Sequence, residues 1–391
     1  CFGNVSVVCD HVLRGCKQCK YESRVWLPEI RKKVLYVDQF FFSCAFRGGD
    51  ARFVEAADKV KRAAHLQLLV APYSSIHEDE TYQWRGYEDF KSDDLMEFIK
   101  AVSRGAEFHK HYDIERTQVT KAWSAFLKRE PAEYVIEDGD AIKGALDGWD
   151  GYYRVDVGGY YKDVELKRSL KGQAVDDLIK TFDQWQISTQ TFEQDVALEM
   201  CDAAKNYLNT YATKASRIAE GDFKAQLDSP IVSQIVGDML DWLPKDQPLD
   251  QKLKLCAEFF MSEHYQQVPN LWISARMFAT LKAMVKRGAY VDREKARQRL
   301  NGVFDDVAHI SLYAPYCDAF FMDQSMADLL RQPAVDIQDR YGVRVFSLHN
   351  QVEFLEWLDE LEREMSDEHK GGIEAAYPLQ LKPKPVTPLK M

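Results

Sequence analysis

Long apolar runs are missing from this chain of 391 residues. No stretch approaches the roughly 18 consecutive apolar residues that a membrane-spanning helix needs, and no apolar segment marks a signal peptide. A membrane partner is therefore not expected, and the cytoplasm is the expected compartment. Hydrophobic residues make up 46% of the chain and charged residues 29%, which are the proportions of an ordinary globular protein.

Positive charge is also scarce. The 51 Lys and Arg residues are outnumbered by 62 Asp and Glu residues, so the formal net charge is −11 at pH 7. This balance argues against a protein that covers nucleic acid with a generally basic surface. A nucleic-acid enzyme with this composition needs a local basic groove beside its site.

Cysteine is sparse, with eight residues in the chain, but half of them lie within the first 19 positions. Cys16 and Cys19 form a C-x₂-C pair, a spacing that is typical of structural zinc sites. The zinc ligands predicted here are Cys1, Cys9, Cys16 and Cys19. His11 is the alternative fourth ligand, and a reduced cluster without metal is the alternative state. We expect ordinary buried thiols at the other positions, which are Cys44, Cys201, Cys256 and Cys317.

The remaining sequence opens and closes with an α/β pattern. Short apolar runs at 33–38 and 66–71 predict buried strands around a helix at 50–65, and strand-like sequence returns at 319–322 and 343–347. Between about 82 and 299 the apolar residues instead follow helical spacing, with an aromatic piece at 152–166 that predicts a hairpin. The two ends of the chain are therefore expected to share one parallel sheet, because neither could bury a core alone.

Acidic residues follow the predicted strands at the positions where each strand ends. Ligand sites in open parallel sheets form at this edge, and several carboxylates there are tolerated when Mg²⁺ or Mn²⁺ neutralises them. The alternative is that each acid only caps a helix. The candidate metal ligands, including the close substitutes Glu78 and Asp318, are Asp38, Glu78, Glu80, Asp306, Asp318 and Asp323. His77 and His309 lie beside these acids and are candidates to orient them.

Three of these segments resemble the PIN-domain nucleases. VLYVDQFFFS is similar to the PIN opening strand that ends in an aspartate, and YSSIHEDE to the helix start that carries the PIN glutamate. DVAHISLYAPYCDAFFMD resembles the later PIN segment, in which an aspartate begins a helix and a second aspartate ends the next strand. The resemblance covers roughly 33–84 and 300–348. It implies that the catalytic, metal-binding acids are Asp38, Glu80, Asp306 and Asp323.

The fold expected from this resemblance is α/β, with a three-layer PIN-like core split by a large helical insertion. The expected segments are a Cys-rich zinc module at 1–32, core parts at 33–84 and 300–348, an insertion at 85–299, and a C-terminal helix with a flexible tail at 349–391. The implied activity is metal-dependent hydrolysis of RNA or DNA, with RNA favoured. A regulatory protein partner and a role as a toxin or defence effector are further expectations.

The sequence is also compatible with two alternative functions. The spacing of Arg104 and His109 is that of the metal-independent HEPN RNases, in which helices present Arg and His to RNA, although Gly105 interrupts the helix. A catalytically inactive nucleic-acid-binding or adaptor protein is the second alternative. A basic groove near the acids would favour the enzyme, and an acidic, closed surface would favour the adaptor.

Overall fold

The computed structural model describes residues 6–15, 21–84, 86–143, 164–226 and 231–377. Its centre is a four-stranded parallel sheet with the strand order β4-β3-β5-β6. The strands are β3 (Lys33–Val37), β4 (Leu69–Val70), β5 (Ala319–Phe321) and β6 (Arg344–Phe346). Leu35 pairs with Ala319 and Val37 with Phe321. The prediction that both ends of the chain share one parallel sheet is confirmed, although β4 has only two of the six residues predicted at 66–71.

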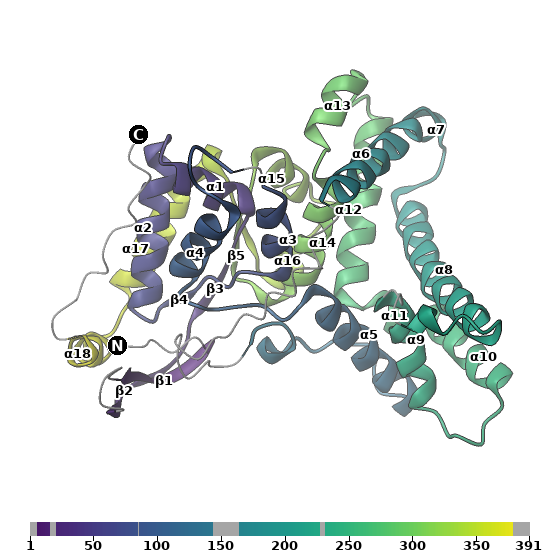
Figure 1. The fold of residues 1–391 in the computed structure, drawn as a ribbon, viewed down its shortest axis with the longest axis horizontal. Coiled ribbons are helices and arrows are strands. Elements are labelled where there is room, and N and C mark those ends of the chain that lie inside the picture. Colours follow the sequence, from purple (N-terminus) through teal and green to yellow (C-terminus); the bar gives the residue numbers. More distant parts are fainter. Residues whose placement is uncertain (1–5, 16–20, 85, 144–163, 227–230, 378–391) are drawn as a thin grey trace.

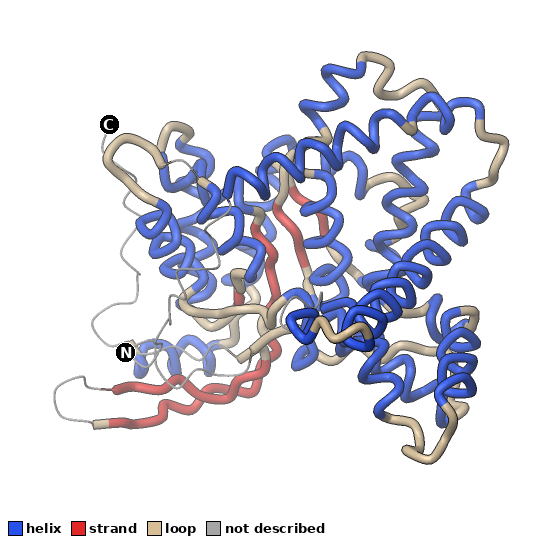
Figure 2. The backbone as a smooth tube through the Cα atoms, turned by 45° about the vertical axis from the view of Figure 1, so that its right-hand side comes forward, coloured by secondary structure: helices blue, strands red, loops and turns tan. Residues whose placement is uncertain are grey.

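Helices cover both faces of this sheet (Figures 1 and 2). Side chains alternate along β3, so Leu35 and Val37 enter one hydrophobic cluster while Val34 and Tyr36 enter the other. The first face is covered by α1 (Gln39–Arg47), α2 (Ala51–His65), α4 (Ser92–Ser103) and α17 (Gln351–Arg363). The second face is covered by α3 (Ser75–Gln83), α14 (Val303–Tyr313), α15 (Gln324–Leu330) and α16 (Ile337–Tyr341). The protein is therefore a mixed α/β structure with a small parallel sheet.

Helices also make up the segment between α4 and α14. Figure 1 places α8 and α10 far from the sheet, and α12 lies between α8 and the core. The helices are α5 (His111–Lys128), α6 (Val164–Lys180), α7 (Phe182–Ile187), α8 (Phe192–Ala219), α9 (Ile231–Asp241), α10 (Leu249–Phe260), α11 (Glu263–Gln266), α12 (Pro269–Lys286) and α13 (Arg293–Arg299). Residues 293–313 form two separate helices, because α13 ends before Gly302 and α14 begins after it.

The N-terminal segment forms a hairpin of β1 (Val8–Gly15) and β2 (Glu22–Arg31), which packs on α18 (Asp367–Ala376) through a small apolar cluster. Cys9 lies buried in this hairpin as a free thiol. Three of the predicted zinc ligands, Cys1, Cys16 and Cys19, lie outside the described residues. The zinc site therefore stays a prediction.

Several other sequence predictions have a clear outcome. Cys256 and Cys317 are buried and Cys44 is partly buried, but Cys201 is exposed, so the prediction of a buried thiol is wrong there. Most of the hairpin predicted at 152–166 lies outside the described residues, and its last three residues begin α6 instead. The C-terminal tail after residue 377 also lies outside them. None of the described helices combines the length and apolar character needed to cross a membrane.

Candidate functional site

Two aspartates stand at the carboxyl ends of adjacent strands. Asp38 follows β3 and is the N-cap of α1, where its Oδ1 accepts a hydrogen bond from the Gln39 backbone N–H at 2.7 Å. Asp323 lies two residues after the end of β5 and caps α15 in the same way, with its Oδ1 3.0 Å from the Met326 backbone nitrogen. Because β3 and β5 are paired and parallel, both carboxylates lie at the same edge of the sheet. The cap bonds fix one oxygen of each carboxylate.

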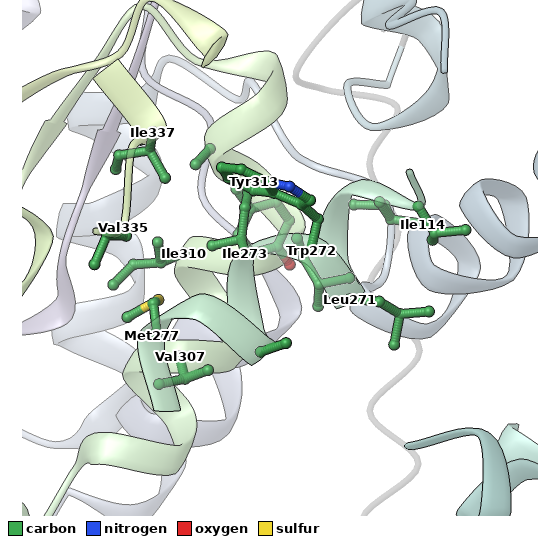
Figure 3. Packing of buried hydrophobic residues seen from close by; sticks show 14 of the residues in the cluster. Ile114, Leu271, Trp272, Ile273, Met277, Val307, Ile310, Tyr313, Val335 and Ile337 are labelled. Atoms are coloured by element: carbon green, nitrogen blue, oxygen red, sulfur yellow. The ribbon is translucent and has the colours of Figure 1, made fainter. Parts of the chain in front are cut away.

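Two further acids reach this edge from helices on the second face of the sheet. Glu80 lies in α3, whose start is fixed by a capping box between Ser74 and His77. Asp306 lies in the first turn of α14. The neighbouring Val307 and Ile310 belong to the large hydrophobic cluster, where they pack against α12, as Figure 3 shows. This packing holds the start of α14 against the core.

The four acids act on one another electrostatically. Burial and the charge of Asp323 raise the pKa of Asp38 to about 7. Burial and the charge of Asp38 raise the pKa of Glu80 to about 8. Burial, followed by the charges of Asp38, Asp323 and Glu80, raises the pKa of Asp306 well above its ordinary value. We call these four residues the acid edge; the structure brings them together from four separate elements.

The described residues provide no direct cationic partner for the acid edge. Within the described part of the chain, no Lys, Arg or His forms an ion pair with any of the four acids. One cation is nearby, because Lys171 of α6 forms an ion pair with Asp305, the residue before Asp306. Its positive charge opposes the rise in the pKa of Glu80. Carboxylates that repel one another without a neutralising partner must either take up protons or bind a cation.

A buried aromatic layer lies beneath the acid edge. His77 bridges two elements, since its Nε2 donates to the Val37 carbonyl at 2.8 Å and its Nδ1 accepts from the Ser74 backbone N–H at 2.9 Å. Burial lowers the pKa of His77 to about 4, so the ring is neutral. His77 stacks on Tyr36, and the Tyr36 hydroxyl is hydrogen-bonded to Nδ1 of His309. Both histidines therefore position the elements that carry the acids. Nε2 of His309 is buried and has no hydrogen-bond partner among the described residues.

Two of the predicted acids do not join the acid edge. Asp318 directly precedes β5 at the opposite edge of the sheet, where its carboxylate accepts from Lys33 Nζ at 2.8 Å, from the Val34 backbone N–H at 2.8 Å and from Arg31 at 3.2 Å. Glu78 lies in α3 two residues before Glu80. Two residues turn a helix by about 200°, so these two glutamates point in nearly opposite directions.

Arg104 and His109, the residues of the HEPN-like alternative, do not lie on helices. The helix α4 ends at Ser103, and Arg104 follows it in a left-handed conformation with φ of 51°. The Arg104 guanidinium contacts Nδ1 of His65 at 3.0 Å. His109 stands in the connection to α5, held by its backbone N–H to the Ala141 carbonyl at 2.7 Å. The two side chains are therefore not presented together by a helix, as the HEPN arrangement requires.

Sequence reasoning missed Asp305 and Lys171. Asp305 directly precedes Asp306, and only the turn of α14 decides which of them faces the other acids. Lys171 comes from the middle of the helical insertion, and no local pattern connects it with residues 305 and 306. The lysine is recognisable as part of this region only from the ion pair in the folded chain.

The described residues contain no group of three or more His, Cys, Asp or Glu side chains that is arranged to hold a metal ion. The acids of the acid edge are thus electrostatic neighbours whose oxygens do not converge on one point. Their chemistry still fits a hard divalent cation, which prefers carboxylate oxygens. No family model, curated protein or solved structure matches this chain.

Proposed function

We propose that the acid edge binds Mg²⁺ or Mn²⁺ and that the protein is a metal-dependent nuclease with a PIN-like core. One observation carries this proposal. Asp38, Glu80, Asp306 and Asp323 come from four elements to one end of a parallel sheet, burial and their mutual repulsion raise the pKa of Asp38, Glu80 and Asp306, and none of the four forms an ion pair with a cation among the described residues. Structural acids of this kind are normally paired, as Asp318 is at the other edge. Strongly shifted carboxylates in such a cluster are candidates for a functional site.

Each acid has a distinct part in this site. Asp38 and Asp323 each use one oxygen for a helix cap, and their second oxygens are available to a ligand. Glu80 and Asp306 reach the same region from α3 and α14, on the second face of the sheet. When bound, a divalent ion activates water and stabilises the departing oxygen of a phosphodiester. The chain's own contribution is to bring four carboxylates to one end of the sheet on helices and strand ends that are packed into the core.

Metal binding and cleavage test this proposal together. We expect Mn²⁺ to bind the wild-type protein in calorimetry. We expect labelled RNA or DNA, offered single- and double-stranded, to be cut with Mg²⁺ or Mn²⁺ and to stay intact with EDTA. Asp38→Asn removes one anionic ligand while keeping the helix cap, so cleavage should fall by about 10²- to 10³-fold. Asp318→Asn is the matched control at the other edge and should stay within a few-fold of wild type.

Three outcomes would count against the proposal. RNA cleavage that survives both EDTA and Asp38→Asn would exclude chemistry at the acid edge. A wild-type protein that binds neither Mn²⁺ nor Mg²⁺ would exclude the metal site. Metal binding without cleavage of any substrate would exclude the nuclease and favour the nucleic-acid-binding or adaptor function.

A further inference from the structure

The helical insertion places one cation next to the acid edge. Lys171 of α6 forms an ion pair with Asp305 in the first turn of α14, directly beside Asp306. Its positive charge opposes the rise in the pKa of Glu80 that burial causes. The same charge adds to the lowering of the pKa of His309 by burial. These interactions put the Lys171 ammonium group at the border of the acid edge, although Lys171 lies 91 residues from Glu80 and more than 100 residues from the other three acids in sequence.

The helix that carries Lys171 is docked against the structure. Asp176, farther along α6, accepts a hydrogen bond at 2.6 Å from Nε of Arg297 in α13. Val175 is buried beside it with 1% of its surface exposed. In α7, Asp183 accepts from Arg293 of α13 at 2.5 Å. The position of Lys171 is thus set by the contacts that α6 and α7 make with α13, as well as by the ion pair between Lys171 and Asp305.

We propose that Lys171 binds a backbone phosphate of the nucleic acid beside the acid edge, so that the insertion completes the substrate site. This inference rests on the nuclease proposed above. A chain with a net charge of −11 that gathers four acids at its site repels phosphate unless a local cation is present. A lysine ammonium is a compact point charge that suits a phosphate oxygen. Asp305 holds this charge near the place where the scissile bond must lie.

The details of the contact favour substrate binding over a built-in counter-ion. Lys171 pairs with Asp305, which lies outside the acid edge, so it does not occupy the oxygens of the four acids. Its side chain keeps 36% of its surface exposed, which leaves the ammonium group accessible to a phosphate. A counter-ion that replaces metal would instead be expected among Asp38, Asp323 and Glu80.

Oligonucleotide binding without cleavage tests the role of Lys171. The protein is loaded with Ca²⁺ in place of Mg²⁺, and the anisotropy of a labelled single-stranded RNA and of a DNA of the same sequence is followed over a series of salt concentrations. We expect Lys171→Met to weaken binding about tenfold and to lower the slope of log K against log salt by roughly 0.7 to 1, the loss of one phosphate contact. Lys171→Arg should retain most of the binding.

A matched control lies on the same helix. Among the described residues Lys180 forms an ion pair with Asp177 alone, in an exposed i, i+3 contact, so Lys180→Met should leave both affinity and salt slope unchanged. The double variant Lys171→Met/Asp305→Asn separates two causes of weaker binding. If the loss of the phosphate contact is the cause, the double variant stays weak. If it binds as well as wild type, the uncovered Asp305 charge is the cause and the proposal is overturned.

The remaining outcomes separate this inference from the proposed function. If Mn²⁺ binds the wild-type protein but Lys171→Met binds the oligonucleotide as tightly as Lys180→Met, Lys171 is not a phosphate ligand and the metal site stands. If Lys171→Met binds Mn²⁺ more tightly and cuts faster, Lys171 is an inhibitory counter-ion and the inference is overturned. If the wild-type protein binds no metal, the proposed function is excluded and this inference with it.

Discussion

The two ends of strand β5 carry aspartates in opposite electrostatic surroundings. Asp318 precedes the strand and lies within 2.8 Å of Lys33 and 3.2 Å of Arg31. These contacts and the Val34 N–H lower its pKa in spite of partial burial. Asp323 follows the strand and faces Asp38, whose pKa burial and this second charge raise to about 7. One edge of the sheet is a neutralised ion-pair network, and the other accumulates unneutralised charge.

This difference distinguishes an acid with a structural role from the acids that we propose bind a metal ion. Both aspartates terminate the same strand, and either could be read from sequence as a metal ligand. The neighbouring strand decides between them, because β3 brings Lys33 to one edge and Asp38 to the other. Paired carboxylates stabilise the fold, whereas clustered and unpaired carboxylates destabilise it and persist when a ligand compensates for the repulsion.

The largest expected effect is on the pH dependence of stability. Asp38 and Glu80 have folded-state pKa values of about 7 and about 8, above the usual values near 4. Between pH 4 and pH 8 the folded state therefore binds protons that the unfolded chain has released. The free energy of unfolding of the metal-free protein should fall across this window by at least about 4 kcal/mol, which is the contribution of Asp38 alone. Urea denaturation in EDTA at half-unit pH steps measures it.

At the other edge of the sheet, the free energy of unfolding should change with pH in the opposite direction and over a different pH range. The lowered pKa of Asp318 contributes stability that is present above pH 4 and lost as the pH falls further.

At the acid edge, saturating Mg²⁺ should remove most of the decline in the free energy of unfolding between pH 4 and pH 8, since the ion binds the deprotonated carboxylates. A stability that rises steadily from pH 4 to pH 8 in EDTA would contradict the assignment of the acid edge.

The next-largest expected effect is that two matched substitutions change the free energy of unfolding in opposite directions. At pH 8 in EDTA, Asp38→Asn should raise the free energy of unfolding by about 1–2 kcal/mol, because it removes a repelled charge and keeps a good helix cap. Asp318→Asn should lower it by about 1 kcal/mol, because it weakens two partly exposed ion pairs. Denaturation of both variants under one set of conditions makes the comparison. Two effects of the same sign would remove the distinction between the edges.

Sequence periodicity predicted the core elements well and their lengths less well. The apolar residues 34–37 and 319–322 are buried on both faces of the sheet, and such short, continuous apolar runs are typical of parallel strands. The strand predicted at 66–71 is shortened to Leu69–Val70, because Leu66 caps α2 and Gln67 takes a left-handed conformation with φ of 59°. Backbone conformations of this kind depend on the packing of a helix end and leave no clear signal in sequence.

The candidate site could be anticipated only in part for the same reason. Acids at strand ends are visible in sequence, and Asp38 and Asp323 indeed share one edge. Asp318 precedes its strand and so lies at the other edge, but its neutralisation there depends on Lys33 and Arg31, residues that β3 and the N-terminal hairpin bring to it. The place of Lys171 depends on the docking of α6 against α13. These are long-range consequences of packing, and local spacing does not contain them.

The smallest expected effect concerns Gly302, which precedes α14. A Cβ at this position would lie 3.1 Å from Oδ2 of Asp306, closer than most such contacts, so the carboxylate must shift by a few tenths of an ångström. Because metal sites are sensitive to ligand position, Gly302→Ala should weaken Mn²⁺ binding by about three- to tenfold. Its effect on the free energy of unfolding should stay within about 1 kcal/mol. Calorimetric titration with Mn²⁺ measures the first quantity.

Gly237 in the middle of α9 is the matched control for this substitution. A Cβ there would meet no atom within 4 Å. Gly237→Ala should therefore stabilise the protein by about 0.5–1 kcal/mol through the helix propensity of alanine, and it should leave the affinity for Mn²⁺ unchanged. Equal Mn²⁺ affinities of the two alanine variants would mean that Asp306 is not a ligand, and the metal site would then rest on Asp38, Glu80 and Asp323.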